Sequence, residues 1–368
     1  MRYVLTIGMT VAVIGAGFYI DRTLSRGAPY ERAQFTPTSS LETLWPAKLD
    51  TREYDERLLR LAAYNPTYHA ASGTDSLASS SLPHYSPNAN VVILSRPWPA
   101  YAPYPHGGAI LPFKRIVAYY GNFYSKQMGI LGEYPEDEVL ARLASTSRVW
   151  ADADPETPVI PAIHYIATVA QHLAGADGMY RVNMPDQEIE KAYAMAKRAG
   201  GILFLDLQVG KSTLEHELPR LRKYLVRPDV HLAIDPEFSM KDGNRPGTTI
   251  GSFDDADINY AIAWLSSIVR EEHLPPKVLV VHRFTESMIK HSDRIQPTAE
   301  TQVVINMDGW GSKTLKRNTY QAVITSEPVQ FAGIKLFYKN DLKPPSSGLL
   351  TPKEVLELIP RPIYVQYQ

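Results

Sequence analysis

The chain has 368 residues, of which 44% are hydrophobic and 21% are charged, and its formal net charge is −1. This length and apolar content suffice for one large globular domain or two ordinary ones. The near-zero net charge makes nucleic acid an unexpected partner, and the absence of cysteine excludes disulfides, thiolate metal sites and a cysteine nucleophile.

The N-terminal segment, residues 1–22, predicts a membrane anchor or a signal peptide. Its core, residues 4–20, is uncharged and lies between Arg2 and Asp21. That length is at the lower limit for a membrane-spanning helix and just above a usual signal-peptide core, so both interpretations stay open. We expect an uncleaved anchor that places the rest of the chain in the cell envelope outside the cytoplasm, or a secreted protein if the segment is cleaved.

Residues 23–111 have the composition of a spacer. They are rich in Pro, Ser, Tyr and Ala and show little periodicity, apart from one amphipathic helix expected at 51–64. We expect this spacer to pack partly on the domain that follows it.

Residues 112–368 predict an α/β fold, a (β/α)8 TIM barrel. Short apolar runs alternate there with longer charged segments of helical spacing, including a helix expected at 285–295. The runs are 115–122, 158–166, 201–210, 231–238, 277–284, 302–311, 333–341 and 362–368. Eight such units in about 250 residues are what a barrel needs. An open doubly wound sheet is the alternative, but the Gly-rich first turn typical of it is missing.

The odd or even position of a residue within each run, here called its parity, predicts which way its side chain points. Alternate residues of a barrel strand face the interior and the surrounding helices. In the run 201–210, Leu203 and Leu205 suit the helix side, so Asp206 and Gln208 point inward. The same rule directs many polar side chains toward the strand ends where such barrels hold their active sites. They are Tyr120, Asn122, His164, Asp206, Gln208, Asp235, Glu237, His282, Asn306, Asp308, Lys335, Lys339, Asp341, Tyr364 and Gln366.

Paired carboxylates at such a rim are the machinery of glycoside hydrolysis, in which one acid protonates the leaving oxygen and the other acts as nucleophile, base or electrostatic partner. Glu237 is the predicted acid, because neighbouring acids would raise its pKa. Asp235 would hold it, and Asp206 and Asp308 are the candidate second carboxylates. The predicted substrate-binding residues are Tyr120, Asn122, His164, Gln208, His282, Asn306, Trp310, Lys339 and Gln366. The expected partners are a glycan and a membrane, with no cofactor.

Other interpretations stay open. An acid at a strand end, such as Asp308 or Asp341, is often only a helix cap or the partner of a lysine. The whole ring could also form a non-catalytic carbohydrate- or cell-wall-binding site. A metal-dependent hydrolase is the third alternative, although nothing in the sequence fixes its ligands. Its metal would be held by Asp206, Asp235, Glu237 and His282.

Several strings of the barrel region carry a resemblance to a known family. They are VAYYGN, MGILGEYPEDEVLARL, LFLDLQVG, HLAIDPEF, KVLVVHRFTESMI, VVINMDGWG, IKLFYKND and VQYQ. Over residues 112–368 the chain resembles an uncharacterised family of bacterial exported or membrane-anchored proteins with a glycoside-hydrolase-like barrel. The resemblance implies this architecture and an envelope location rather than a reaction.

Overall fold

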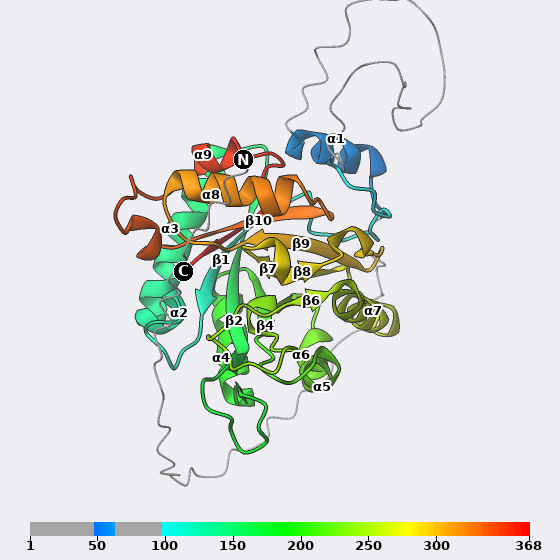
Figure 1. Ribbon diagram of the computed structural model, residues 1–368. Helices are drawn as coiled ribbons and strands as arrows, with labels where there is room; N and C mark the ends of the chain where they lie inside the picture. Colours follow the sequence, from blue (N-terminus) through cyan, green and yellow to red (C-terminus); the bar gives the residue numbers. More distant parts are fainter. Residues whose placement is uncertain (1–47, 63–97) are drawn as a thin grey trace, which may run out of the picture.

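The computed structural model shows a closed barrel of parallel strands surrounded by helices (Figure 1). It describes residues 48–62 and 98–368. The barrel strands are β1 (Arg115–Gly121), β2 (Val159–Ala170), β4 (Ile202–Leu207), β5 (Val230–Ile234), β7 (Lys277–Arg283), β9 (Thr301–Met307), β10 (Phe331–Leu336) and β11 (Tyr364–Tyr367). Each pairs in parallel with its neighbours, and β1 pairs with both β2 and β11, which closes the sheet. The predicted barrel of eight parallel strands is confirmed.

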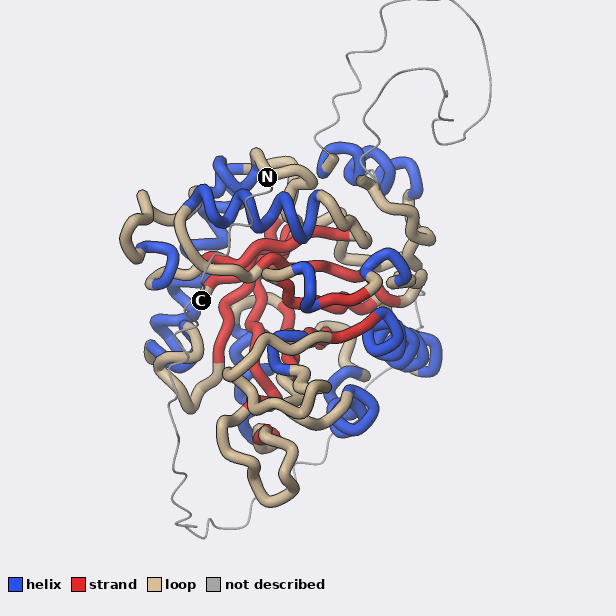
Figure 2. The backbone as a smooth tube through the Cα atoms, in the orientation of Figure 1, coloured by secondary structure: helices blue, strands red, loops and turns tan. Residues whose placement is uncertain are grey.

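Helices cover the outside of the barrel (Figure 2). In chain order they are α2 (Ile130–Glu133), α3 (Glu136–Ala153), α4 (Asp186–Arg198), α5 (Leu214–Glu217), α6 (Arg222–Leu225), α7 (Asp255–Glu271), α8 (Lys313–Tyr320) and α9 (Pro352–Leu356). Between α5 and α6 the backbone forms a 3₁₀ turn that contains Pro219, since proline lacks the amide hydrogen that an α-helix interior needs. A short strand, β3 (Arg181–Asn183), pairs in the antiparallel direction with the end of β2.

The crossover after β7 differs from its prediction, because residues 285–295 do not form a helix. The segment contains two 3₁₀ turns, Glu286–Met288 and Ser292–Arg294, and the short strand β8 (Ile289–Lys290), which pairs with β6 (Phe253–Asp254). Burial of Ile289 against this partner strand outweighs the local helical spacing of charges, as tertiary contacts often do.

The apolar side chains form two layers, one on each side of the barrel sheet. Leu203 and Leu205 belong to the outer layer, which packs against the helices. Phe204, Ala233 and Val280 belong to the inner layer, which fills the barrel. The parity rule is therefore confirmed for the strands from which these residues come.

A helix from the predicted spacer closes the N-terminal end of the barrel. Helix α1 (Thr51–Leu61) contributes Tyr54 and Leu61 to the inner layer, beside Ile202 and Phe331 at the starts of β4 and β10. Helix α1 therefore seals the N-terminal end of the barrel interior, and polar side chains collect at the C-terminal end.

The predicted anchor, residues 1–22, lies outside the described residues. Among the helices that the structure does describe, none combines the length and the apolar character needed to cross a membrane.

Candidate active site

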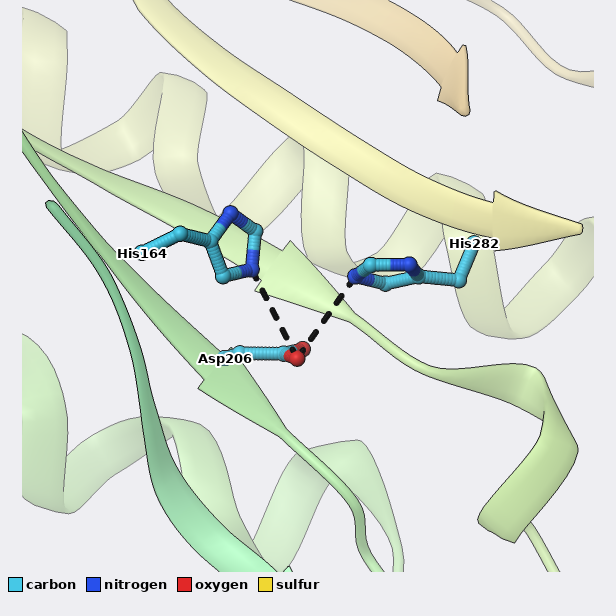
Figure 3. Close-up of side chains that lie close together, drawn as sticks. All are labelled: His164, Asp206 and His282. Atoms are coloured by element: carbon cyan, nitrogen blue, oxygen red, sulfur yellow. Dashed lines mark ion pairs between the residues drawn. The ribbon is translucent and has the colours of Figure 1, made fainter. Parts of the chain in front are cut away.

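Two histidines and one aspartate meet in the barrel interior. His164 on β2, Asp206 on β4 and His282 on β7 are all fully buried. Figure 3 shows the two imidazole rings converging on the carboxylate of Asp206. Each histidine Nε2 lies 3.5 Å from Oδ2 of Asp206. One ligand atom from each of the three residues falls within 4.8 Å of the others, so this group has the donor set and spacing to hold a metal ion.

The outer nitrogens of both imidazoles are held by further side chains. Nδ1 of His282 lies 2.9 Å from Oδ2 of Asp308, and Nδ1 of His164 lies 2.6 Å from the hydroxyl of Tyr364. The Tyr364 hydroxyl also accepts a hydrogen bond from Gln366 at 3.0 Å. These contacts fix the ring orientations, and therefore aim both Nε2 atoms at Asp206.

The electrostatics of this group follow from burial and close charges. Burial alone would lower the pKa of His282, but Asp206 and Asp308 outweigh it and raise that pKa to about 10. For His164 burial dominates and lowers the pKa to about 4. Burial would raise the pKa of Asp206, yet the imidazoles of His282 and His164 hold it well below its usual range. Asp206 is therefore ionised.

The carboxylates Asp235 and Glu237 belong to a turn rather than to a strand. Strand β5 ends at Ile234, and Oδ1 of Asp235 accepts a hydrogen bond from the backbone N–H of Glu237 at 3.1 Å, which caps the turn. Oδ2 of Asp235 accepts a hydrogen bond from Gln208 at 3.2 Å. Asp235 is buried and Glu237 is partly buried, so Glu237 is the more accessible of the two.

Both acids of this turn have raised pKa values. Burial raises the pKa of Asp235 to about 7, and Asp206 and Asp308 add to the shift. Burial, followed by the charges of Asp235 and Asp308, raises the pKa of Glu237 to about 8, against the opposing charge of Lys335. At neutral pH Glu237 therefore carries a proton in most molecules.

A buried lysine lies inside the same group. Nζ of Lys335 lies 3.6 Å from the centroid of the Tyr120 ring, and only 4% of the Lys335 surface is exposed. Burial lowers the pKa of Lys335, against the opposing effect of Asp308 and Asp235. Parity correctly directs both Lys335 and Tyr364 inward, but neither is among the predicted catalytic or substrate-binding residues.

Tyr120 is also part of this buried group. Its ring centroid lies 5.2 Å from that of His164 and 5.9 Å from that of His282. Burial raises the pKa of its hydroxyl well above the usual value, and the charges of Asp206 and Asp235 add to this shift. Tyr120 therefore lies on the floor of the site, rather than at its rim as a platform for sugar rings.

The buried amides Asn306 and Gln366 complete the floor. Nδ2 of Asn306 donates a hydrogen bond to Oε1 of Gln366 at 3.4 Å. Gly333 on β10 makes room for Asn306, because a Cβ there would lie 2.8 Å from Oδ1 of Asn306.

Two predicted binding residues, Lys339 and Asn122, make contacts elsewhere, and a third, Trp310, lies in a loop. Lys339 is exposed and its Nζ lies 2.7 Å from Glu133, because β10 ends at Leu336 and parity no longer applies beyond it. Asn122 donates a hydrogen bond to the carbonyl of Ile166 at 3.0 Å, so its amide is used within the fold. Trp310 follows β9 in a loop and is 40% exposed.

Asp341 fits the interpretation as a lysine partner. Its side chain accepts hydrogen bonds from the backbone N–H groups of Gly311 and Phe337, both at 2.9 Å. It also lies 3.1 Å from Nζ of Lys316. Asp341 therefore joins two loops and is not part of the candidate site.

Comparison with known proteins gives no family. No protein-family model matches the sequence, and no curated protein matches it. The resemblance to an uncharacterised exported family therefore stays a prediction.

Among solved structures, the chain is similar to a hyperthermophilic endo-β-1,4-glucanase in complex with substrate. The match has a TM-score of 0.35 and 9% sequence identity, and it covers 70% of this chain and 89% of the glucanase chain. A similarity at this level carries no argument about substrate or mechanism.

Proposed function

We propose that the protein is a glycoside hydrolase of the cell envelope, acting on a polysaccharide or cell-wall glycan at the carboxyl ends of the barrel strands. The observation that carries the proposal is the state of Glu237. Glu237 as a residue is partly exposed, and burial of its carboxyl, followed by the charges of Asp235 and Asp308, raises its pKa to about 8. A carboxylic acid that keeps its proton at neutral pH is what protonation of a glycosidic oxygen requires.

Asp308 is the second carboxylate in this proposal. Its Oδ2 accepts a hydrogen bond from Nδ1–H of His282, and its Oδ1 has no hydrogen-bond partner within the described residues. That oxygen is buried, and in the proposed role it would stabilise positive charge at the anomeric carbon, or act as base or nucleophile, once a substrate reaches it. Asp206 is less suited to this role because it is fully buried between two imidazoles.

Trp310 would provide a sugar contact in the loop that carries the second carboxylate. It follows Asp308 by two positions in the same loop, and 40% of its surface is exposed. An exposed indole face suits stacking against the apolar face of a sugar ring. The envelope location belongs to the same proposal, and it is supported only by the uncharged residues 4–20.

A metal-dependent hydrolase is the second candidate, and one observation favours it. The group His164, Asp206 and His282 offers three buried ligand atoms within 4.8 Å of one another. Catalytic zinc sites commonly use three such protein ligands and leave a position for water or substrate.

One assay separates these candidates. The full chain is incubated with a panel of cell-wall and storage glycans, and new reducing ends are measured with and without a chelator. Cleavage that survives chelation supports the carboxylate mechanism, whereas chelator-sensitive cleavage supports the metal-dependent one. Glycan binding without new reducing ends would instead indicate a non-catalytic binding protein and would contradict the proposal.

A further inference from the structure

We propose that His164, Asp206 and His282 form a binding site for one divalent transition-metal ion, with Zn²⁺ the best match. The inference goes beyond the proposed function and does not depend on it, because it concerns ion binding at the floor of the barrel in the absence of any glycan. It also departs from the ligand set that the sequence suggested, because it uses His164 and leaves out Asp235 and Glu237.

The spacing of the ligand atoms fits a metal better than it fits hydrogen bonds. Nε2 of each histidine lies 3.5 Å from Oδ2 of Asp206. Good N–H···O hydrogen bonds measure about 2.9 Å between heavy atoms. Zinc takes nitrogen and oxygen ligands at about 2.0–2.1 Å in a tetrahedron, which separates two ligand atoms by ~3.3–3.4 Å. The observed separation is close to that tetrahedral edge.

The ligand atoms are buried and have no hydrogen-bond partner. Within the described residues, Nε2 of His164, Nε2 of His282 and both carboxylate oxygens of Asp206 make no hydrogen bond. All three residues are 0% exposed. Buried polar atoms without partners cost free energy and are rare in folded proteins. A single cation among them would satisfy two nitrogens and the carboxylate at once.

The surroundings of the imidazoles match those of metal-binding histidines. Such histidines usually donate their second ring N–H to a carboxylate, a carbonyl or another oxygen, and this fixes the tautomer that offers the other nitrogen to the metal. His282 has Asp308 at 2.9 Å in this position. His164 has the Tyr364 hydroxyl at 2.6 Å, and with a metal on Nε2 the hydroxyl oxygen accepts a hydrogen bond from Nδ1–H of His164.

The local charge also favours a cation. Asp206 and Asp308 are buried carboxyl groups on the two sides of the His282 ring, at 3.5 Å and 2.9 Å from its nitrogens, and Lys335 is a buried cation in the same group. A proton competes with the metal ion for Nε2 of His282, and its binding would make His282 an imidazolium between Asp206 and Asp308. Neutral imidazole with a carboxylate suits Zn²⁺ and related transition metals rather than Mg²⁺ or Ca²⁺, which prefer oxygen ligands.

The test is a titration of the chelator-treated full chain with ZnCl₂, followed by calorimetry and thermal unfolding. We expect one bound Zn²⁺ per chain and a higher midpoint of unfolding. Asp206→Asn, which keeps the side-chain size, should abolish binding, and so should His164→Gln. Asp341→Asn is the matched control, since it replaces a buried carboxylate that lies outside the candidate site, and it should still bind.

A readout on the wild-type chain covers the case in which the variants do not fold. Zn²⁺ should shift the imidazole NMR signals of two of the ten histidines in the chain. The inference is overturned if folded wild type shows no binding at ~1 mM Zn²⁺. It is also overturned if the shifted signals do not come from His164 and His282, or if folded Asp206→Asn and His164→Gln bind as wild type does. Since no glycan is present, a failure to bind Zn²⁺ would remove the metal-dependent candidate but would leave the carboxylate mechanism untouched, so the two failures are distinguishable.

Discussion

Nδ1 of His282 lies 2.9 Å from Oδ2 of Asp308, and both side chains are buried. The contact joins β7 to the loop after β9 and leaves Nε2 of His282 directed at Asp206, at 3.5 Å. Asp308 thus orients the imidazole through Nδ1, and Asp206 faces the other ring nitrogen, Nε2. The orientation of His282 therefore depends on Asp308, whichever ion occupies the centre.

Replacing the orienting carboxylate should weaken metal binding without removing a ligand. In Asp308→Asn the acceptor charge is lost, and we expect Zn²⁺ affinity to fall by ~10–100-fold, as it does when other second partners of metal-bound histidines are removed. Calorimetric titration measures this. An affinity equal to that of wild type would show that Asp308 does not position His282 for a metal.

The pH dependence of activity should follow Glu237. Because its pKa is raised to about 8, the acid is protonated below that pH and ionised above it. We expect kcat/KM to fall as pH rises through about 8, since the free enzyme then loses its proton donor. A pH–rate profile tests this expectation, and a descending limb centred well below neutral pH would contradict the assigned role of Glu237.

Stability should also fall toward alkaline pH. Asp235 and Glu237 have folded-state pKa values of about 7 and about 8, both above the ordinary values of unfolded carboxyl groups. A raised pKa stabilises the fold below the unfolded pKa, and this contribution is lost as pH rises through the folded pKa. Urea unfolding of the wild type should therefore give a lower free energy at pH ~9 than at pH ~5, and Glu237→Gln should reduce the difference.

Two lysines near the end of β10 form a matched pair. Lys335 is buried among the acids, whereas Lys339 is exposed and lies 2.7 Å from Glu133. We expect Lys335→Met to lower the free energy of unfolding by about 3 kcal/mol, because buried carboxylates lose their counter-charge. It should also move the alkaline limb of activity to higher pH, since Lys335 lowers the pKa of Glu237.

Lys339→Met is the control for that experiment and should leave both quantities near wild type, because exposed ion pairs contribute little. The measurements are chemical denaturation and the pH–rate profile. Equal effects of the two substitutions would mean that Lys335 does not act on the candidate site.

The strands could be predicted from the sequence because parallel barrel strands are buried on both faces and appear as short apolar runs. Parity then identified inward residues such as Asp206 and His282 correctly, as far as each strand continues. It failed for Lys339, which lies beyond the end of β10 at Leu336. It directed Lys335 inward correctly, and that residue is inside the strand and buried.

The meeting of His164 with Asp206 could not be predicted, because it depends on the stagger between strands. In the register of β2 against β4, His164 lies opposite Phe204 and Ile166 lies opposite Asp206, and apolar periodicity within a single strand does not reveal this alignment. Parity says which way a side chain points, but depth along the barrel axis decides which side chains meet. The helix predicted at 285–295 was wrong for a related reason, because the pairing between β6 and β8 is a tertiary contact.

The most direct test of the proposed function compares two glutamate variants of the full chain on a glycan that the wild type cleaves. Glu237→Gln removes the proton donor and keeps the side-chain shape. Glu286→Gln changes an exposed glutamate just after β7 and serves as the control.

We expect Glu237→Gln to lower kcat by ~10²–10⁴-fold with an unchanged thermal midpoint at acidic pH, while Glu286→Gln keeps wild-type activity. Wild-type rates in a folded Glu237→Gln variant would contradict the account, because no acid would then be needed at that position.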